Sequence, residues 1–184
     1  RSGGYSLEID PELIDLWRFR RLVDRARAAG DGERFALFGE ALALWRGQAL
    51  GGTDGAWALG MRATLEEEQV TAEIAYAQES LRLGSHELLL ERMCGLSSRH
   101  PLNEAIAGQL MLALHRSGRD GDALRVHARI RARLRYDLGT DPGPALAEIH
   151  RRILTVDRSV GLPSSPAVVP RQLPPCTPDF VGRD

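Results

Sequence analysis

The chain has 184 residues, 43% of them hydrophobic and 27% charged, a composition typical of a globular domain of ordinary size. All 24 basic residues are arginines and the net charge is only -1, so bulk electrostatics gives no reason to expect a polyanionic partner. No segment is apolar enough to predict a membrane span. Cys94 and Cys176 have no ligand residues at metal-binding spacing, so we expect free thiols in a reducing cytoplasm.

The first residues of the chain alternate in polarity. Tyr5, Leu7 and Ile9 alternate with polar residues before a proline interrupts the pattern. This alternation predicts one β-strand over residues 1–10. Because a lone strand is not stable in water, we expect its partner strands to lie in a preceding part of a longer protein.

The remainder of the chain as far as residue 155 has the periodicity of helices. Apolar residues recur at intervals of three and four, and turns rich in Gly, Pro and Asp separate the segments. An array of helices joined by short turns predicts an all-α fold. The seven expected helices run from Asp15 to the turn at Gly30 and over residues 33–46, 57–83, 86–98, 103–117, 120–138 and 144–155.

A repeat of 34 residues is present within this array. Gly84 and Gly118 are 34 positions apart, each precedes a polar turn and a helix, and Leu90 and Leu124 match at the same offset. Thirty-four residues is the period of tetratricopeptide repeats, in which helix pairs stack to bury their apolar faces. The consensus match is partial, since Met111 stands where that repeat has glycine. We therefore predict degenerate tetratricopeptide-like helix pairs.

The composition changes again after residue 155. Six of the ten prolines lie within residues 163–178, so the segment 156–178 is interpreted as an extended linker. Phe180 and Val181 follow it with nothing local to bury them. We expect residues 179–184 to begin a further domain.

The sequence contains no recognisable catalytic or phosphate-binding motif. A Walker A loop is impossible without lysine, and dinucleotide-binding, nucleophile-elbow and zincin motifs do not occur. His127 lies on the apolar side of its helix and is interpreted as a core histidine. The run Glu66, Glu67 and Glu68 diverges around its helix and is interpreted as a solvated face. We therefore expect neither an enzyme nor a bound cofactor or metal.

The sixth expected helix has two distinct faces when it is drawn at 100° per residue. Arg125, Arg129 and Arg133 recur every four residues opposite the apolar side, and we call these three residues the arginine ridge. Arg131 and Arg135 flank the apolar stripe, where their stems can cover it. We interpret the ridge as a solvated surface or a docking site for an acidic protein patch. Nucleic-acid binding is less favoured, because no aromatic residues interleave with the arginines. The apolar stripe comprises Ala123, His127, Ile130, Leu134 and Leu138.

Three segments of the sequence point to a known family. They are FRRLV a few residues after Asp15, ALALWRG, and LGTDPGPAL before an arginine-rich last helix. Together they resemble the bacterial transcriptional activation domain (BTAD) of the SARP family, the antibiotic regulatory proteins of actinobacteria. The resemblance covers about residues 1–155 and assigns residues 11–155 to a helical BTAD. Trp17 stands where this family usually has histidine.

The resemblance also gives the two flanking segments a context. In this family a winged-helix DNA-binding domain precedes the BTAD, and residues 1–10 resemble the last strand of its wing. In larger members a nucleotide-binding NB-ARC ATPase domain follows, and residues 179–184 resemble its start. The resemblance thus implies a regulatory module within a longer transcriptional activator of antibiotic biosynthesis genes.

The resemblance implies specific partners. The activator would bind promoter DNA through the winged helix as a homodimer and contact RNA polymerase, without a membrane and in the cytoplasm. We expect the arginine ridge to contact protein. The alternative is a tetratricopeptide-like scaffold that binds peptides in a concave groove without a role in transcription. The residues expected to pack against the DNA-binding domain are Tyr5, Leu7, Ile9, Trp17 and Phe19.

Overall fold

The computed structural model describes residues 10, 14–85 and 87–159, and this part of the chain is entirely helical. The strand expected over residues 1–10 and the segments expected as a linker and a further domain fall almost wholly outside the described residues. The elements are α1 (Asp15–Ala28), α2 (Asp31–Ala43), α3 (Ala56–Leu83), α4 (Glu87–Arg99), α5 (Glu104–Arg116), α6 (Asp120–Arg133), a π-helical turn η2 (Leu134–Leu138) and α7 (Pro144–Ser159).

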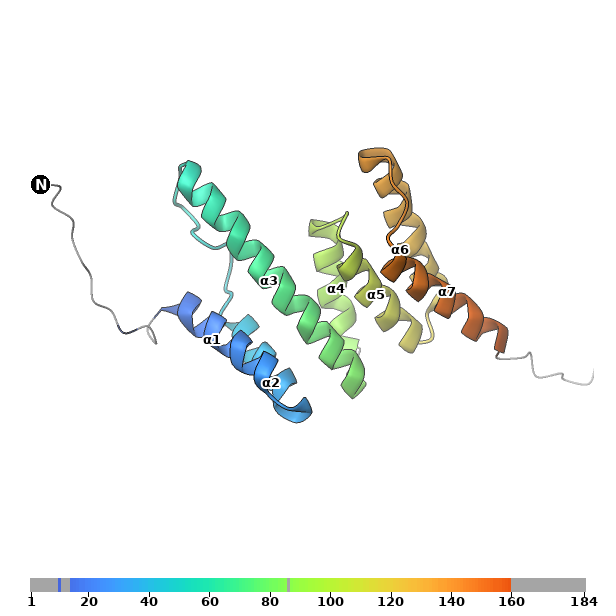
Figure 1. The fold of residues 1–184 in the computed structure, drawn as a ribbon, viewed down its shortest axis with the longest axis horizontal. Helices are drawn as coiled ribbons and strands as arrows, with labels where there is room; N and C mark the ends of the chain where they lie inside the picture. The colour runs from blue at the N-terminus through green and yellow to red at the C-terminus, as the bar shows by residue number, and fades with distance from the viewer. Residues whose placement is uncertain (1–9, 11–13, 86, 160–184) are drawn as a thin grey trace, which may run out of the picture.

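The helices follow one another across the molecule roughly in chain order (Figure 1). The α1–α2 hairpin packs on the long helix α3, the α4–α5 hairpin packs next to it, and α6 and α7 complete the array. α5 is the central element, because it contacts α3, α4, α6 and α7. This arrangement confirms the predicted all-α, tetratricopeptide-like fold.

The 34-residue repeat has a structural basis in two equivalent turns. Gly84 and Gly118 both adopt the left-handed conformation, with φ of 82° and 70°, which glycine reaches without steric cost. The amide of the residue after each glycine bonds the carbonyl five residues earlier, at 2.9 Å in both turns, as in a Schellman cap. The period that the sequence shows is therefore the distance between two helix-ending turns of the same geometry.

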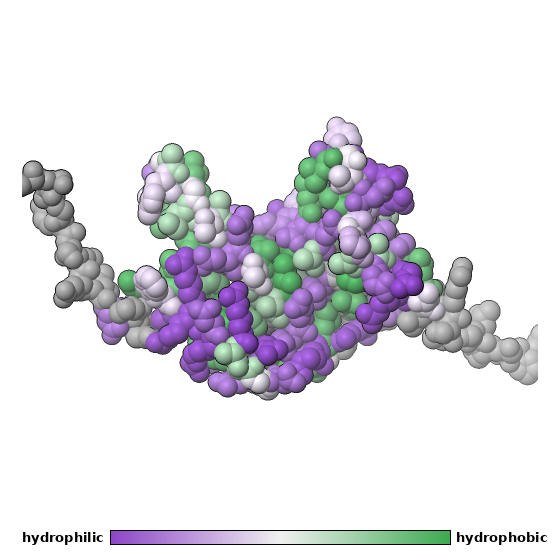
Figure 2. Space-filling model, viewed as in Figure 1, coloured by the Kyte–Doolittle hydropathy of each residue, from purple (hydrophilic) through white to green (hydrophobic). Residues whose placement is uncertain are grey.

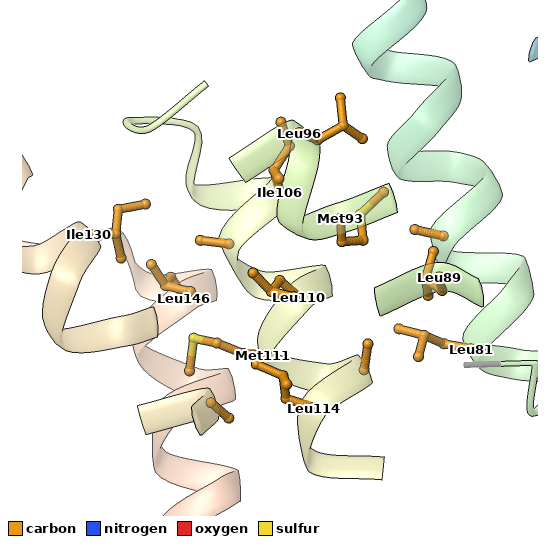
Figure 3. Packing of buried hydrophobic residues seen from close by; sticks show 14 of the residues in the cluster. Leu81, Leu89, Met93, Leu96, Ile106, Leu110, Met111, Leu114, Ile130 and Leu146 are labelled. Atoms are coloured by element: carbon orange, nitrogen blue, oxygen red, sulfur yellow. The ribbon is translucent and has the colours of Figure 1, made fainter. Parts of the chain in front are cut away.

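One apolar cluster joins α3 to α7. It is organised around α5, whose Ile106 and Met111 are fully buried (Figure 3). Side chains from α3, α4, α6, η2 and α7 surround them, so each neighbour of α5 closes another side of the same core. Its other large buried members are Leu81, Leu89, Met93, Leu96, Leu110, Leu114, Ile130, Leu134, Leu146 and Ile153.

A second cluster lies between α1, α2 and α3. Phe19 is 3% exposed and meets the Trp45 ring edge-on, with centroids 5.3 Å apart. Edge-to-face contact at this distance is a favourable aromatic geometry. Phe38 and Leu42 of α2 are also buried here. The N-terminal hairpin therefore has a core of its own, which α3 covers.

The apolar stripe predicted for residues 120–138 is correct except at its last member. Leu138 is 58% exposed, whereas the four other members are buried. The reason is that α6 ends in the π-helical turn η2, where the 3.6-residue register that defines the stripe is lost. In space-filling view, the η2 end and the N-terminal end of α3 project on either side of a hollow (Figure 2). None of the helices in the described ranges is long and apolar enough to cross a membrane.

Candidate functional site

The arginine ridge lines a groove between α4, α5 and α6. The groove has a volume of about 320 Å³ and contains all three ridge residues together with Arg119. Cys94, Ser97 and Ser98 of α4 form the opposite wall. The ridge is thus one side of a concave surface and not an isolated convex face. The apolar residues that line the groove are Pro101, Ala107, Leu110, Leu114, Val126 and Ile130.

Charge in the groove is unbalanced. Asp122 is its one acidic lining residue and receives hydrogen bonds from Arg125 and from Arg119, the latter at 2.7 Å. These two bonds, Arg125 first, lower the pKa of Asp122, so this carboxylate is ionised and already satisfied. Arg129 and Arg133 have no ion-pair or hydrogen-bond partner among the described residues. The groove therefore carries an excess of positive charge that the described structure does not neutralise.

The arginines on the other side of the same helix are paired. Arg135 and Arg131 donate to Asp141, in the loop before α7, at 2.9 and 3.2 Å. These bonds lower the pKa of Asp141, with Arg135 contributing most. These two arginines were expected only to cover the apolar stripe with their stems. Asp141 is ten and six positions away from them in the sequence, and it reaches them because the loop before α7 bends back beside the helix. The two rows of arginine on this helix thus differ: one is paired internally and the other is open.

A second hollow lies at the N-terminal end of α1. It has a volume of about 490 Å³ and is lined mainly by apolar residues of α1 and of the segment between α2 and α3, including Leu16, Leu44 and Leu50. Phe19 lines it from the core, and Trp17, 54% exposed, lies two residues away. The other three residues expected at an interdomain contact, Tyr5, Leu7 and Ile9, lie outside the described residues.

His127 is buried, as expected for a core histidine, but it has a partner that the sequence did not reveal. Its ring stacks on His150 of α7, with centroids 3.8 Å apart and planes within 9°. Burial, then the charges of His150 and Arg131, lower the pKa of His127. The rings of His127 and His150 are 23 positions apart in the sequence and meet because α6 packs against α7. The helical spacing within one segment could not predict this contact.

The acidic run of α3 follows its predicted role in part. Glu66 and Glu67 are exposed, as a solvated face requires. Glu68 is half-buried and accepts two hydrogen bonds from Arg20 of α1, at 2.7 and 2.9 Å. Within the described ranges, no three His, Cys, Asp or Glu residues cluster in a way that could hold a metal ion.

Comparison with known proteins places this helical array in a family. The model of the bacterial transcriptional activator domain matches residues 14–154. The chain is 38% identical to the regulatory protein AfsR of Streptomyces griseus over 99% of its own length and 20% of that protein. It is 39% identical to the regulatory protein DnrI of Streptomyces peucetius, over 86% of this chain and 60% of that one. It thus spans between a fifth and three fifths of these relatives.

A solved structure has the same fold. Mycobacterium tuberculosis EmbR, determined in complex with a low-affinity phosphopeptide, superposes with a TM-score of 0.77 at 31% identity, over 85% of this chain and 42% of that one. The family match, the relatives and this fold agree with the segments that suggested a BTAD. The chain therefore belongs to the bacterial transcriptional activator domain family, as the BTAD of a SARP-type transcriptional regulator.

Proposed function

We propose that the chain is the regulatory interaction domain of a transcriptional activator of antibiotic biosynthesis genes. It packs on a winged-helix DNA-binding domain, supports dimerisation on promoter DNA and contacts RNA polymerase, in the cytoplasm. The observation that carries the proposal is the family match over residues 14–154, which includes α1 to α6 in full and most of α7. The role is docking and not catalysis, so its energy comes from apolar surface and its specificity from charge.

The hollow beside α1 supports the packing role. The hollow is an apolar depression of about 490 Å³, and Trp17, which follows its lining residue Leu16 in the sequence, is exposed. Exposed apolar surface of this kind is typical of protein–protein interfaces. The hollow lies where the chain enters the helical array, close in sequence to residues 1–10. We propose that Trp17 and this hollow receive the DNA-binding domain, with Phe19 as the rigid floor, and that Tyr5, Leu7 and Ile9 belong to the strand that leads into it.

A gel-shift comparison tests which part of the protein reads DNA. We expect this chain alone to bind promoter DNA weakly and without sequence preference, with affinity that collapses as salt rises. A longer protein that includes an upstream winged helix should bind specifically. Tight, sequence-specific binding by the 184-residue chain would contradict the proposal. Trp17→Ala in the longer protein should weaken promoter binding if the hollow orients the DNA-binding domain.

A transcription assay tests the polymerase contact. Charge reversal of the arginine ridge in the longer protein should reduce activation more than it reduces promoter binding, since the ridge lies on α6 and its groove shares no lining residue with the hollow at α1 that receives the DNA-binding domain in this proposal. The opposite ranking would assign the ridge to DNA. Equal and small effects on activation and on promoter binding would show that the ridge does not contact polymerase.

A further inference from the structure

We propose that the groove between α4, α5 and α6 binds an acidic segment of a partner protein, a short stretch in which carboxylates alternate with aliphatic side chains. The inference deepens the proposed contact with the transcription machinery and rests on it only for the identity of the partner. The chemistry of the segment follows from the groove alone.

The groove carries positive charge that is not paired within the described residues. Four guanidinium groups and one carboxylate line the groove, and the carboxylate is shared by Arg119 and Arg125. Arg129 and Arg133 have no partner among the described residues, in contrast to Arg131 and Arg135 on the other side of the helix. The whole chain has a net charge of -1, so this concentration of unpaired positive charge is local. A partner with negative charge would complete it.

The groove also has an apolar lining. Leu110 and Leu114 of α5, with Val126 and Ile130 of α6, form apolar surface beside the arginines. A bare polyanion would leave this surface uncovered, whereas aliphatic side chains would fill it and gain roughly 25 cal/mol for each Å² removed from water. No aromatic residue lines the groove for stacking a base, which favours a peptide over a nucleic acid.

The spacing of the ridge arginines matches that of alternate residues in an extended peptide. Ridge residues four apart on a helix are separated by about 6 Å along its axis. In an extended peptide, alternate residues are about 7 Å apart on the same side of the chain. Carboxylates at every second position therefore match the ridge, and the residues between them project elsewhere, where the apolar lining can receive some of them. Ser97 and Ser98 on the opposite wall offer hydroxyl groups to the peptide backbone.

The flanking segments of this chain do not supply that chemistry. Residues 160–184 contain two arginines and two aspartates, and residues 1–9 contain one arginine and one glutamate. Neither segment has the negative charge that would complement the groove. The occupant therefore lies outside these 184 residues, and we assign it to a partner protein.

The test uses this 184-residue chain and a fluorescein-labelled peptide in which three aspartates alternate with two leucines. We expect binding, measured by fluorescence anisotropy, that weakens about tenfold or more in the double variant Arg129→Glu/Arg133→Glu. The matched variant Arg131→Glu/Arg135→Glu makes the same change of charge on the other side of the helix. It should bind within about twofold of the parent chain, because only screened, longer-range charge is altered. Circular dichroism confirms that both variants are folded.

Two altered peptides separate charge from shape. Asparagine in place of each aspartate should abolish binding, and serine in place of each leucine should weaken it several-fold. Equal losses in the two double variants, equal binding of the asparagine peptide, or no binding at about 1 mM peptide would each overturn the proposal. Groove-dependent binding of a DNA duplex in preference to the peptide would also overturn it and assign the groove to nucleic acid. If activation by a longer regulator depends on the ridge but this peptide does not bind, the proposed polymerase contact stands. The proposal that the groove binds an acidic peptide then fails.

Discussion

At the scale of single residues, the most buried charged side chain among the described residues is paired with one partner. Glu73 of α3 is 4% exposed and accepts two hydrogen bonds from Arg92 of α4, one of them at 2.7 Å. The Arg92 guanidinium also lies over the Tyr76 ring, 5.2 Å from its centroid. The hydrogen bonds to Glu73 raise the pKa of Arg92. This pair joins α3 to α4, two helices whose backbones approach each other closely at few positions.

Removing Arg92 and removing Glu73 should lower the free energy of unfolding by different amounts. Arg92→Met leaves the buried Glu73 carboxylate without a partner and should lower the free energy of unfolding by about 3 kcal/mol. Glu73→Met leaves Arg92, whose side chain is 38% exposed and can turn to water, so its cost should be about 1 kcal/mol. Urea denaturation of both variants measures the difference. A larger loss for Glu73→Met would show that the carboxylate is not the desolvated partner.

The stacked histidines predict a pH dependence of stability. Because the folded state lowers the pKa of His127 below its ordinary value of 6.5, the unfolded chain takes up this proton first. The contribution to stability is therefore complete above about pH 6.5 and is lost as the pH falls towards the lower folded pKa. His127→Phe preserves a ring against His150 and removes the titration. Chemical denaturation between about pH 7 and pH 5 should show a shallower decline for this variant than for the parent chain. Identical slopes would remove His127 from the acid response.

At the scale of elements, local patterns predicted helices well because each helix here has an apolar side and a defined stop. The bounds of α5, for example, follow from Asn103, whose side chain caps the amide of Ile106 at 3.1 Å, and from the turn at Gly118. Local patterns failed where the outcome depends on more than the apolar period. The period gives no sign of the π-helical turn that ends at Leu138, and the pairing of Arg131 with Asp141 depends on the path of the loop that leads to α7.

Helices α5 and α7 approach each other closely at Gly108 of α5. A Cβ atom added there would lie 2.9 Å from Cδ1 of Ile149, so α7 rests directly on this glycine. Gly108→Val should push the Ile149 side chain out of this contact and lower the free energy of unfolding by about 1–3 kcal/mol. Gly95→Val in α4 is the matched control, because a Cβ there meets nothing within 4 Å and the change in helix propensity is the same. Thermal unfolding should therefore separate the two variants by several degrees, and equal melting temperatures would contradict this packing.

At the scale of the whole molecule, α3 is what makes two clusters into one structure. Ala77 and Leu81 belong to the cluster around α5, whereas Ala72 belongs to the cluster under the N-terminal hairpin. Apolar residues therefore occur on more than one side of α3, unlike the single stripe of the shorter helices. The sequence predicted the length of α3 and its turns, but it could not predict which residues join which cluster, because that depends on how neighbouring helices lie across it. The candidate groove was missed for the same reason. The arginine ridge can be predicted from the sequence of α6 alone. The opposite wall of the groove comes from α4 and cannot be predicted in this way.

This sharing of α3 predicts cooperative unfolding of the whole array. Trp17 lies on α1 and Trp45 packs against the hairpin cluster, whereas Trp57 is exposed at the start of α3. Tryptophan fluorescence therefore reports chiefly on the hairpin cluster, while far-UV circular dichroism reports on every helix. We expect the two signals to change at the same urea concentration, since loss of either cluster removes packing from α3. Phe38→Ala, which opens a cavity in the hairpin cluster, should lower the free energy of unfolding by about 3–5 kcal/mol.

Both signals should still move together in that variant. If fluorescence changed at lower urea than circular dichroism, the hairpin would unfold as a separate unit, and α3 would be a scaffold that only the cluster around α5 stabilises. Cooperative behaviour would instead mean that a partner bound in the groove beside α6 and a domain docked beside α1 act on one folding equilibrium. Each would then raise the stability of the helix array as a whole, by an amount set by its own affinity.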